Sequence, residues 1–349
     1  MSPNAFGHQQ NTCLGTLKHF TPSPFIRRVL SMQVNYRSTL LMVFLAWILT
    51  YILLFLDYWS ALTASTIFFF LTFPFWHNVL STPSKRRSVP LLYALLIYTF
   101  FVVLRALEYL LWEQQYKIYV LEKTPGFMLL VFLTLMFSID PRENGYRRDQ
   151  LLERRSKAML IIYGIVTGYT VYAIVDALLY VYPYMNALIF TVSTLFFIVN
   201  SFFEEYLFRG ILYTTLSERL GVLKGGFLVQ SLLFGAWHII HHLNNPISIY
   251  SVIHISFTIL FALIAATYRY LTGSIAYPIL VHTYVNVLSD LENAYTHYCI
   301  YSIEDICVQH NMALTFLLTI TTLALALYHA AKTKSYRKIL KLLKRSSNI

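Results

Sequence analysis

Long apolar stretches with few charges recur along the whole chain. A helix needs about 20 mostly apolar residues to cross the hydrocarbon core of a bilayer. The pattern therefore predicts an all-α protein, a polytopic transmembrane helical bundle with about ten spans. One candidate, 126–139, is short for a span. The predicted spans cover residues 39–58, 61–81, 89–112, 126–139, 158–182, 186–212, 225–241, 248–268, 273–290 and 312–331.

Composition supports an integral membrane protein whose surroundings are a lipid bilayer. The chain is 57% hydrophobic and only 12% charged, whereas a soluble domain carries about twice that charged fraction. Its net charge of +11 comes from basic residues in short loops, where the positive-inside rule places them. We therefore expect no nucleic-acid partner.

The loops also predict an orientation. Basic clusters lie at 85–87, 142–157 and 332–345, and the loop at 291–311 has no Lys or Arg. If both termini are cytoplasmic, every basic loop faces the cytoplasm. This agreement favours an even number of spans. The basic and apolar tail at 332–344 is suited to an anionic inner leaflet.

Two further features of the chain leave alternatives open. Cys299 and Cys307 fall in the outer loop, so they either form a disulfide in an oxidising compartment or remain two free thiols. Met32 precedes a short basic lead and the first apolar run. Residues 1–31 are therefore either genuine or an extension ahead of the true start.

Three charges stand close together inside one apolar segment, at Glu204, Glu205 and Arg209. Charges at membrane depth are costly and usually functional. Arg209 lies four residues after Glu205, so the two share a helical face and can pair. Adjacent helical residues point about 100° apart, which leaves Glu204 without a sequence-local partner. We expect burial to favour its neutral form, which suits a general acid or base toward water.

Histidines occur at similar depth on later segments. His282 and Asn286 share one helical face, and two such donors suit a developing oxyanion, although inter-helix hydrogen bonding is the alternative. His238 is either a packing residue or part of the same site. We expect His241 and His242 to be interfacial and His254 to be a packing residue, because only Ser251 and Thr258 lie at helical spacing from it.

A zinc site is the main alternative to metal-free acid–base chemistry. Two histidines and a glutamate are zinc ligands in many proteins. No HExxH motif is present, so Glu204, His238 and His282 would have to converge from three helices. We therefore favour a site without a metal or other cofactor.

Three motifs appear in order along the chain. They are EExxxR from Glu204 to Arg209, FxxxH from Phe234 to His238, and HxxxN from His282 to Asn286. Together they resemble the CPBP family (CAAX protease and bacteriocin-processing, also called Abi) of intramembrane glutamic endopeptidases. The resemblance covers roughly residues 158–290.

The resemblance implies roles for these residues. Glu204 and His238 would activate the attacking water, and His282 and Asn286 would form the oxyanion hole. Glu205 and Arg209 would give structural support. The substrate would be a membrane-associated or lipidated peptide or protein. The membrane would be a bacterial or archaeal plasma membrane, or the endoplasmic reticulum in a eukaryote.

These observations divide the chain into four parts. Residues 1–38 form a cytoplasmic N-terminal segment, 39–157 additional transmembrane helices, 158–290 the catalytic helical core, and 291–349 the outer loop, last span and basic tail. Two other functions remain open. One is a proton-coupled transporter, which predicts repeat symmetry that the sequence does not show. The other is a non-proteolytic scaffold or bacteriocin-immunity protein of the same fold.

Overall fold

The computed structural model is built almost entirely of helices, as the hydrophobic pattern predicts. Residues from Val34 onward belong to one compact unit. The structure describes residues 36–81, 91–112, 115–137, 144–146, 164–169, 171–172, 175, 187–242, 248–294, 301–303, 306–308 and 310–332.

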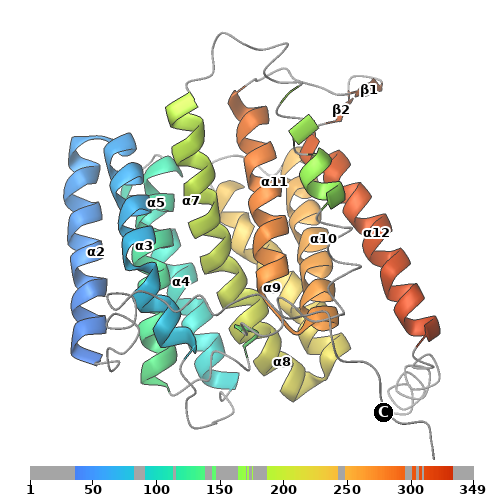
Figure 1. Cartoon of the computed structure of the whole chain (residues 1–349), viewed down its shortest axis with the longest axis horizontal. Coiled ribbons are helices and arrows are strands. Elements are labelled where there is room, and N and C mark those ends of the chain that lie inside the picture. The colour runs from blue at the N-terminus through green and yellow to red at the C-terminus, as the bar shows by residue number, and fades with distance from the viewer. Residues whose placement is uncertain are drawn as a thin grey trace, which may run out of the picture. The chain divides into compact units, whose positions relative to one another are not determined.

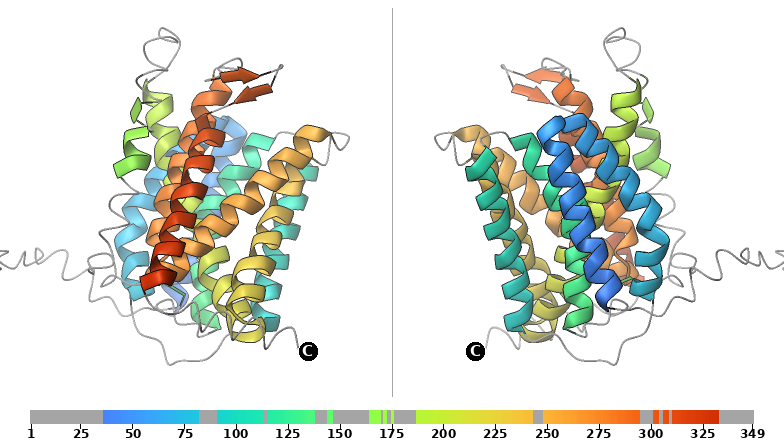
Figure 2. Two further views of the ribbon diagram at one scale, coloured as in Figure 1. Left: turned by 90° about the vertical axis from the view of Figure 1, so that its right-hand side faces the viewer. Right: turned by 90° about the vertical axis from the view of Figure 1, so that its left-hand side faces the viewer.

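Eight long α-helices account for most of the described residues (Figure 1). At one side α2 packs against α3 and α5, and at the other α12 packs against α10 and α11 (Figure 2). Between them, α7 contacts both α5 and α11. The long helices are α2 (Tyr36–Leu56), α3 (Tyr58–Ser81), α4 (Leu91–Trp112), α5 (Gln115–Met136), α7 (Ala187–Glu205), α10 (Ile249–Thr272), α11 (Ala276–Ala294) and α12 (His310–Lys332).

Helix length and surface composition suit a bilayer. Within the described residues, Trp59–Ser81, Val222–His242 and Ser251–Thr272 are long and apolar enough to cross a membrane. Large apolar side chains such as Phe44 and Leu71 are 60% and 75% exposed. Such surface is costly in water and favourable against lipid. The protein is an integral membrane protein, while the count of ten spans and the sidedness of its termini stay predictions.

Two parts of the chain differ from the expected pattern. The short predicted span at 126–139 belongs to α5, which already begins at Gln115 and contains Pro125. The predicted span began after Pro125 and so left out the charged residues before it, whereas helix α5 includes them. A two-stranded antiparallel ribbon also departs from the all-α expectation: β1 (Tyr301–Ile303) pairs with β2 (Ile306–Val308). Cys307 lies in β2, and Cys299 lies outside the described residues, so the disulfide stays a prediction.

The predicted spans at 186–212 and 225–241 form a connected series of short helical segments. After α7, the chain enters a π-helix, η2 (Tyr206–Leu212), and then α8 (Tyr213–Leu220). A second π-helix, η3 (Val222–Val229), leads into α9 (Gln230–His238) and the 3₁₀ turn η4 (Ile239–His242). π segments are rare in proteins, and those that occur are often found at functional sites. Here the first one begins directly after Glu205.

Two glycines allow α8 and η3 to pack closely. A Cβ on Gly225 would clash with the Leu216 backbone oxygen, and one on Gly226 would clash with Ser217 Oγ. The chain reverses at Gly221, whose φ of 82° favours glycine. The close contact between α8 and η3 fixes the direction of α9, which follows η3. It therefore also fixes the position of His238 at the end of α9.

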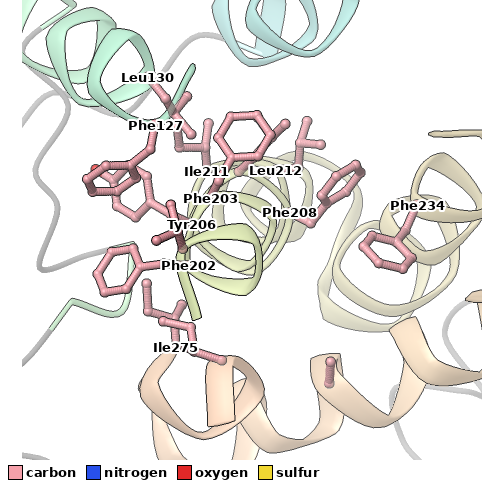
Figure 3. Packing of buried hydrophobic residues seen from close by; sticks show 14 of the residues in the cluster. Phe127, Leu130, Phe202, Phe203, Tyr206, Phe208, Ile211, Leu212, Phe234 and Ile275 are labelled. Atoms are coloured by element: carbon pink, nitrogen blue, oxygen red, sulfur yellow. The ribbon is translucent and has the colours of Figure 1, made fainter. Parts of the chain in front are cut away.

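Aromatic side chains form the core around α7. The ring of Phe127 on α5 lies 5.0 Å from that of Phe202 on α7, and the ring of Phe208 in η2 lies 4.8 Å from that of Phe234 on α9. Figure 3 shows these rings on opposite sides of the α7–η2 backbone. The core thus fixes α5 and α9 against the segment that carries Glu204 and Glu205.

A Gly225→Ala substitution should destabilise the protein by about 3 kcal/mol or more, the upper end for overpacking, because the clashing atom is backbone and cannot rotate away. Gly168→Ala is the matched control, since a Cβ there meets no atom within 4 Å. Thermal unfolding of the two purified variants in detergent measures the difference. Equal midpoints would contradict the close packing of α8 and η3.

Candidate active site

Glu204 forms a buried ion pair that the sequence analysis did not predict. Lys123 Nζ on α5 donates to Glu204 Oε1 at 2.7 Å, and the two side chains are 0% and 4% exposed. The ammonium also lies 5.1 Å from the Phe203 ring centroid and 5.6 Å from that of Trp237. Glu204 was expected to have no partner at helical spacing, and its partner indeed lies on another helix. The partner is 81 residues away in sequence, so helical spacing could not reveal it.

Glu205 has two partners on the same oxygen. Arg209 Nη1 donates to Oε1 at 2.9 Å, and His282 Nδ1 lies 2.7 Å from the same atom. The first contact is the pair that the spacing predicts; the second comes from α11 and was not predicted. The Arg209 guanidinium also lies 4.3 Å from the Phe234 ring centroid. Burial of the arginine is thus offset by an ion pair and by a cation–π contact.

His282 lies between the two carboxylates. Its Nδ1 contacts Glu205, while its Nε2 lies 3.6 Å from Glu204 Oε2. That separation is too long for a direct hydrogen bond. Among the described residues, Glu204 Oε2 has no hydrogen-bond partner. One oxygen of Glu204 is therefore held by Lys123, and the other faces the free nitrogen of His282.

His238 and Asn286 are placed around the same helix end. His238 Nδ1 donates to the Phe234 carbonyl oxygen at 2.8 Å, which leaves Nε2 as the acceptor of a neutral ring. The centroid of the His238 ring lies 4.7 Å from that of Phe234, which lies 6.0 Å from that of His282. Asn286 Nδ2 lies 3.5 Å from Ser201 Oγ, a weak contact with the α7 turn that precedes Glu204. The four predicted catalytic residues thus come from α7, α9 and α11.

Three further histidines, His241, His242 and His254, form a polar cluster next to His238. Arg105 Nη2 on α4 donates to His241 Nε2 at 2.8 Å, and His242 Nε2 lies 2.9 Å from His254 Nδ1 on α10. Arg105 is buried and lies 4.6 Å from the Trp237 ring centroid. His241 and His242 are partly buried and have partners on α4 and α10, while their interfacial placement stays a prediction. His254, expected to be a packing residue, has a partner beyond its own helix.

The geometry does not assemble the zinc alternative. Within the part of the chain that the structure describes, no three His, Cys, Asp or Glu side chains are grouped as a metal site requires. Of the three proposed ligands, His282 lies 3.6 Å from Glu204, and the described residues do not group them with His238 as a metal site.

Residues 186–288 match the family described as Type II CAAX prenyl endopeptidase Rce1-like. The matched segment runs from the start of α7 into α11 and contains all three motifs. Residues 186–288 are therefore similar to a type II CAAX prenyl endopeptidase domain. No curated protein and no solved structure matches the chain.

The match confirms the resemblance drawn from the three motifs and supports CAAX-protease-type activity in a membrane. Two cations near the site lie outside the Rce1-like domain. Lys123 belongs to α5 and Arg105 to α4. The matched segment also falls within the predicted core at 158–290, whose own limits stay a prediction.

A Glu205→Gln substitution should destabilise the protein by about 3–5 kcal/mol, because it leaves the buried Arg209 without its counter-charge. Thermal unfolding and the yield of monodisperse protein measure this loss. Glu218→Gln is the matched control, since Glu218 is exposed on α8. An unchanged unfolding midpoint for Glu205→Gln would show that the Arg209 charge is compensated in another way.

Proposed function

We propose that this protein is an intramembrane glutamic endopeptidase. It hydrolyses a peptide bond in a membrane-associated or lipidated peptide or protein, using water activated by Glu204 and His238. One observation carries the proposal: Glu204 Oε2, the oxygen that accepts no hydrogen bond among the described residues, lies 3.6 Å from His282 Nε2. Both residues belong to a domain similar to type II CAAX prenyl endopeptidases.

The two proposed bases have free acceptor atoms. A general base must lie within hydrogen-bond reach of the proton that it removes. Glu204 Oε2 is available because Lys123 holds Oε1. His238 Nε2 is available because Nδ1 donates its hydrogen bond to the Phe234 carbonyl oxygen. In the proposed mechanism both acceptor atoms act on the same water molecule.

His282 and Asn286 are the proposed donors to the oxyanion. Ionised Glu205 only accepts hydrogen bonds, so His282 Nδ1 must carry a proton. Donation from His282 Nε2 to an oxyanion requires a proton on that nitrogen as well. Asn286 adds an amide donor that Ser201 holds only weakly. Glu205 thus supports the site in two ways: it compensates Arg209 and it orients the His282 ring.

Hydrolysis follows from these positions. Glu204 takes a proton from water while the water oxygen attacks the carbonyl carbon, and the resulting oxyanion accepts hydrogen bonds from His282 and Asn286. The C–N bond then breaks as Glu204 or His238 delivers a proton to the leaving amine. No covalent intermediate with the enzyme forms.

A Glu204→Gln variant should have almost no activity, because an amide cannot accept the proton from water. Asn286→Ala should retain measurable cleavage, about 100- to 1000-fold slower, because one oxyanion donor is lost while the base remains. The assay is cleavage of a lipidated CAAX-type peptide by reconstituted protein, followed by mass spectrometry. Glu218→Gln serves as the control.

A wild-type rate in folded Glu204→Gln protein would reject this mechanism. A non-proteolytic scaffold would be favoured by two results together. Neither the wild type nor any variant would cleave the peptide, and cells that carry Glu204→Gln would have an unaltered phenotype.

The proposed topology has about ten spans with both termini in the cytoplasm. A reporter enzyme that works only in the cytoplasm should therefore be active when it is fused after Ile349, and a reporter that works only after translocation should be inactive there. A reporter inserted in the 291–311 loop, which lacks Lys and Arg, should show the opposite result. Activity of a translocated reporter at the C-terminus would exclude this topology.

A further inference from the structure

A residue outside the Rce1-like domain holds the proposed catalytic base. Lys123 belongs to α5, whereas the family match begins at residue 186. Its ammonium nevertheless makes the shortest contact that Glu204 has in the described structure, 2.7 Å to Oε1. The site is thus built from more of the chain than the family match covers.

This ion pair is shut off from solvent. Lys123 is fully buried, and the aromatic rings of Phe203 and Trp237 lie within 6 Å of its ammonium. A buried ammonium requires an opposite charge nearby, because desolvation of an unpaired ion is costly. Glu204 supplies that charge. With weak solvent screening, the two groups are held together more firmly than a surface pair would be.

The backbone of Lys123 is fixed against the helix that carries Glu204. Phe127 lies one turn further along α5, on the same face as Lys123, and its ring packs 5.0 Å from that of Phe202. At Gly126 α5 lies within van der Waals range of α7, since a Cβ at that position would lie 3.6 Å from the Phe203 ring. The ammonium is therefore a fixed point relative to the carboxylate.

The two oxygens of Glu204 have different surroundings as a result. Rotation about the last side-chain torsion would exchange them if neither were held. Lys123 holds Oε1, so Oε2 stays directed toward His282 Nε2, 3.6 Å away. The oxygen that faces His282 is also the one that the proposed mechanism uses.

We propose that Lys123 is a positioning residue for the Glu204 carboxylate in the proposed hydrolysis. This inference rests on the proposed function. It extends the catalytic unit from the Rce1-like domain to α5. Lys123 acts through Glu204 and does not itself touch the substrate, so its loss changes the rate of the chemical step more than substrate binding.

The test compares kcat and KM for Lys123→Met, Lys123→Arg and the control Lys224→Met in reconstituted full-length protein. Lys224 is exposed in η3, so its substitution should change neither constant. Lys123→Met should lower kcat by about 100-fold, the scale of a misplacement of about 1 Å, with KM unchanged. Lys123→Arg should recover part of the loss, to about 10-fold below wild type, because it keeps the charge but has a different head-group geometry.

Folding is measured on the same samples by thermal unfolding, and rates are normalised to monodisperse protein. Lys123→Met leaves Glu204 without its counter-charge, so Lys123→Met/Glu204→Gln, which removes both charges, should unfold at a higher temperature than Lys123→Met. If Lys123→Met does not fold, Lys123→Arg carries the test, and its kcat must still fall at unchanged KM.

The outcomes separate this inference from the proposed function. An active Glu204→Gln variant would reject both. An inactive Glu204→Gln variant together with wild-type kcat in either folded Lys123 variant would overturn the positioning role alone. A raised KM at unchanged kcat would also overturn it, because Lys123 would then act in substrate binding.

Discussion

Two adjacent carboxylates buried at the end of α7 impose the main physical constraint on this protein. In an apolar interior each charge requires an opposite charge and hydrogen bonds, or its desolvation outweighs any gain from packing. Glu204 is compensated by Lys123, and Glu205 by Arg209 and by the Nδ1 group of His282. Because the two side chains point about 100° apart, their partners come from different directions. Helices α5 and α11 must therefore both pack against α7.

The backbone changes form where this constraint is greatest. The α-helix ends at Glu205, and the following π-helix carries Arg209 and is buried along its whole length. Arg269 Nε on α10 donates to the Arg209 carbonyl oxygen at 3.2 Å, which satisfies a backbone group in this irregular segment. The glycines between α8 and η3 then return the chain so that α9 places Phe234 beside Arg209.

The arrangement gives the neighbouring glutamates different chemistry. Both oxygens of a carboxylate can accept protons, but Glu205 Oε1 already accepts from a guanidinium and an imidazole. Glu204 has one oxygen held by an ammonium and the other near His282 Nε2. Although the two residues are chemically identical, Glu205 is thus suited to structural support and Glu204 to acid–base catalysis. This division is the physical basis for the proposed peptidase activity of the Rce1-like domain.

The sequence by itself determined the helical class and most of the helix positions, and its three motifs carry the resemblance to CAAX proteases that the match at residues 186–288 supports. It also predicted the Glu205–Arg209 pair. These features depend on local spacing, which hydrophobic period and i,i+4 geometry reveal. Only the tertiary structure decided that Lys123 pairs with Glu204, that His282 contacts both glutamates, and that Arg105 reaches His241. Each of these contacts joins helices that are 77 to 136 residues apart, where no periodic pattern links the partners. The start of α5 was missed for the same reason. In the sequence, Lys123 interrupts the apolar pattern, but in the structure it is buried inside α5 because the distant Glu204 compensates its charge.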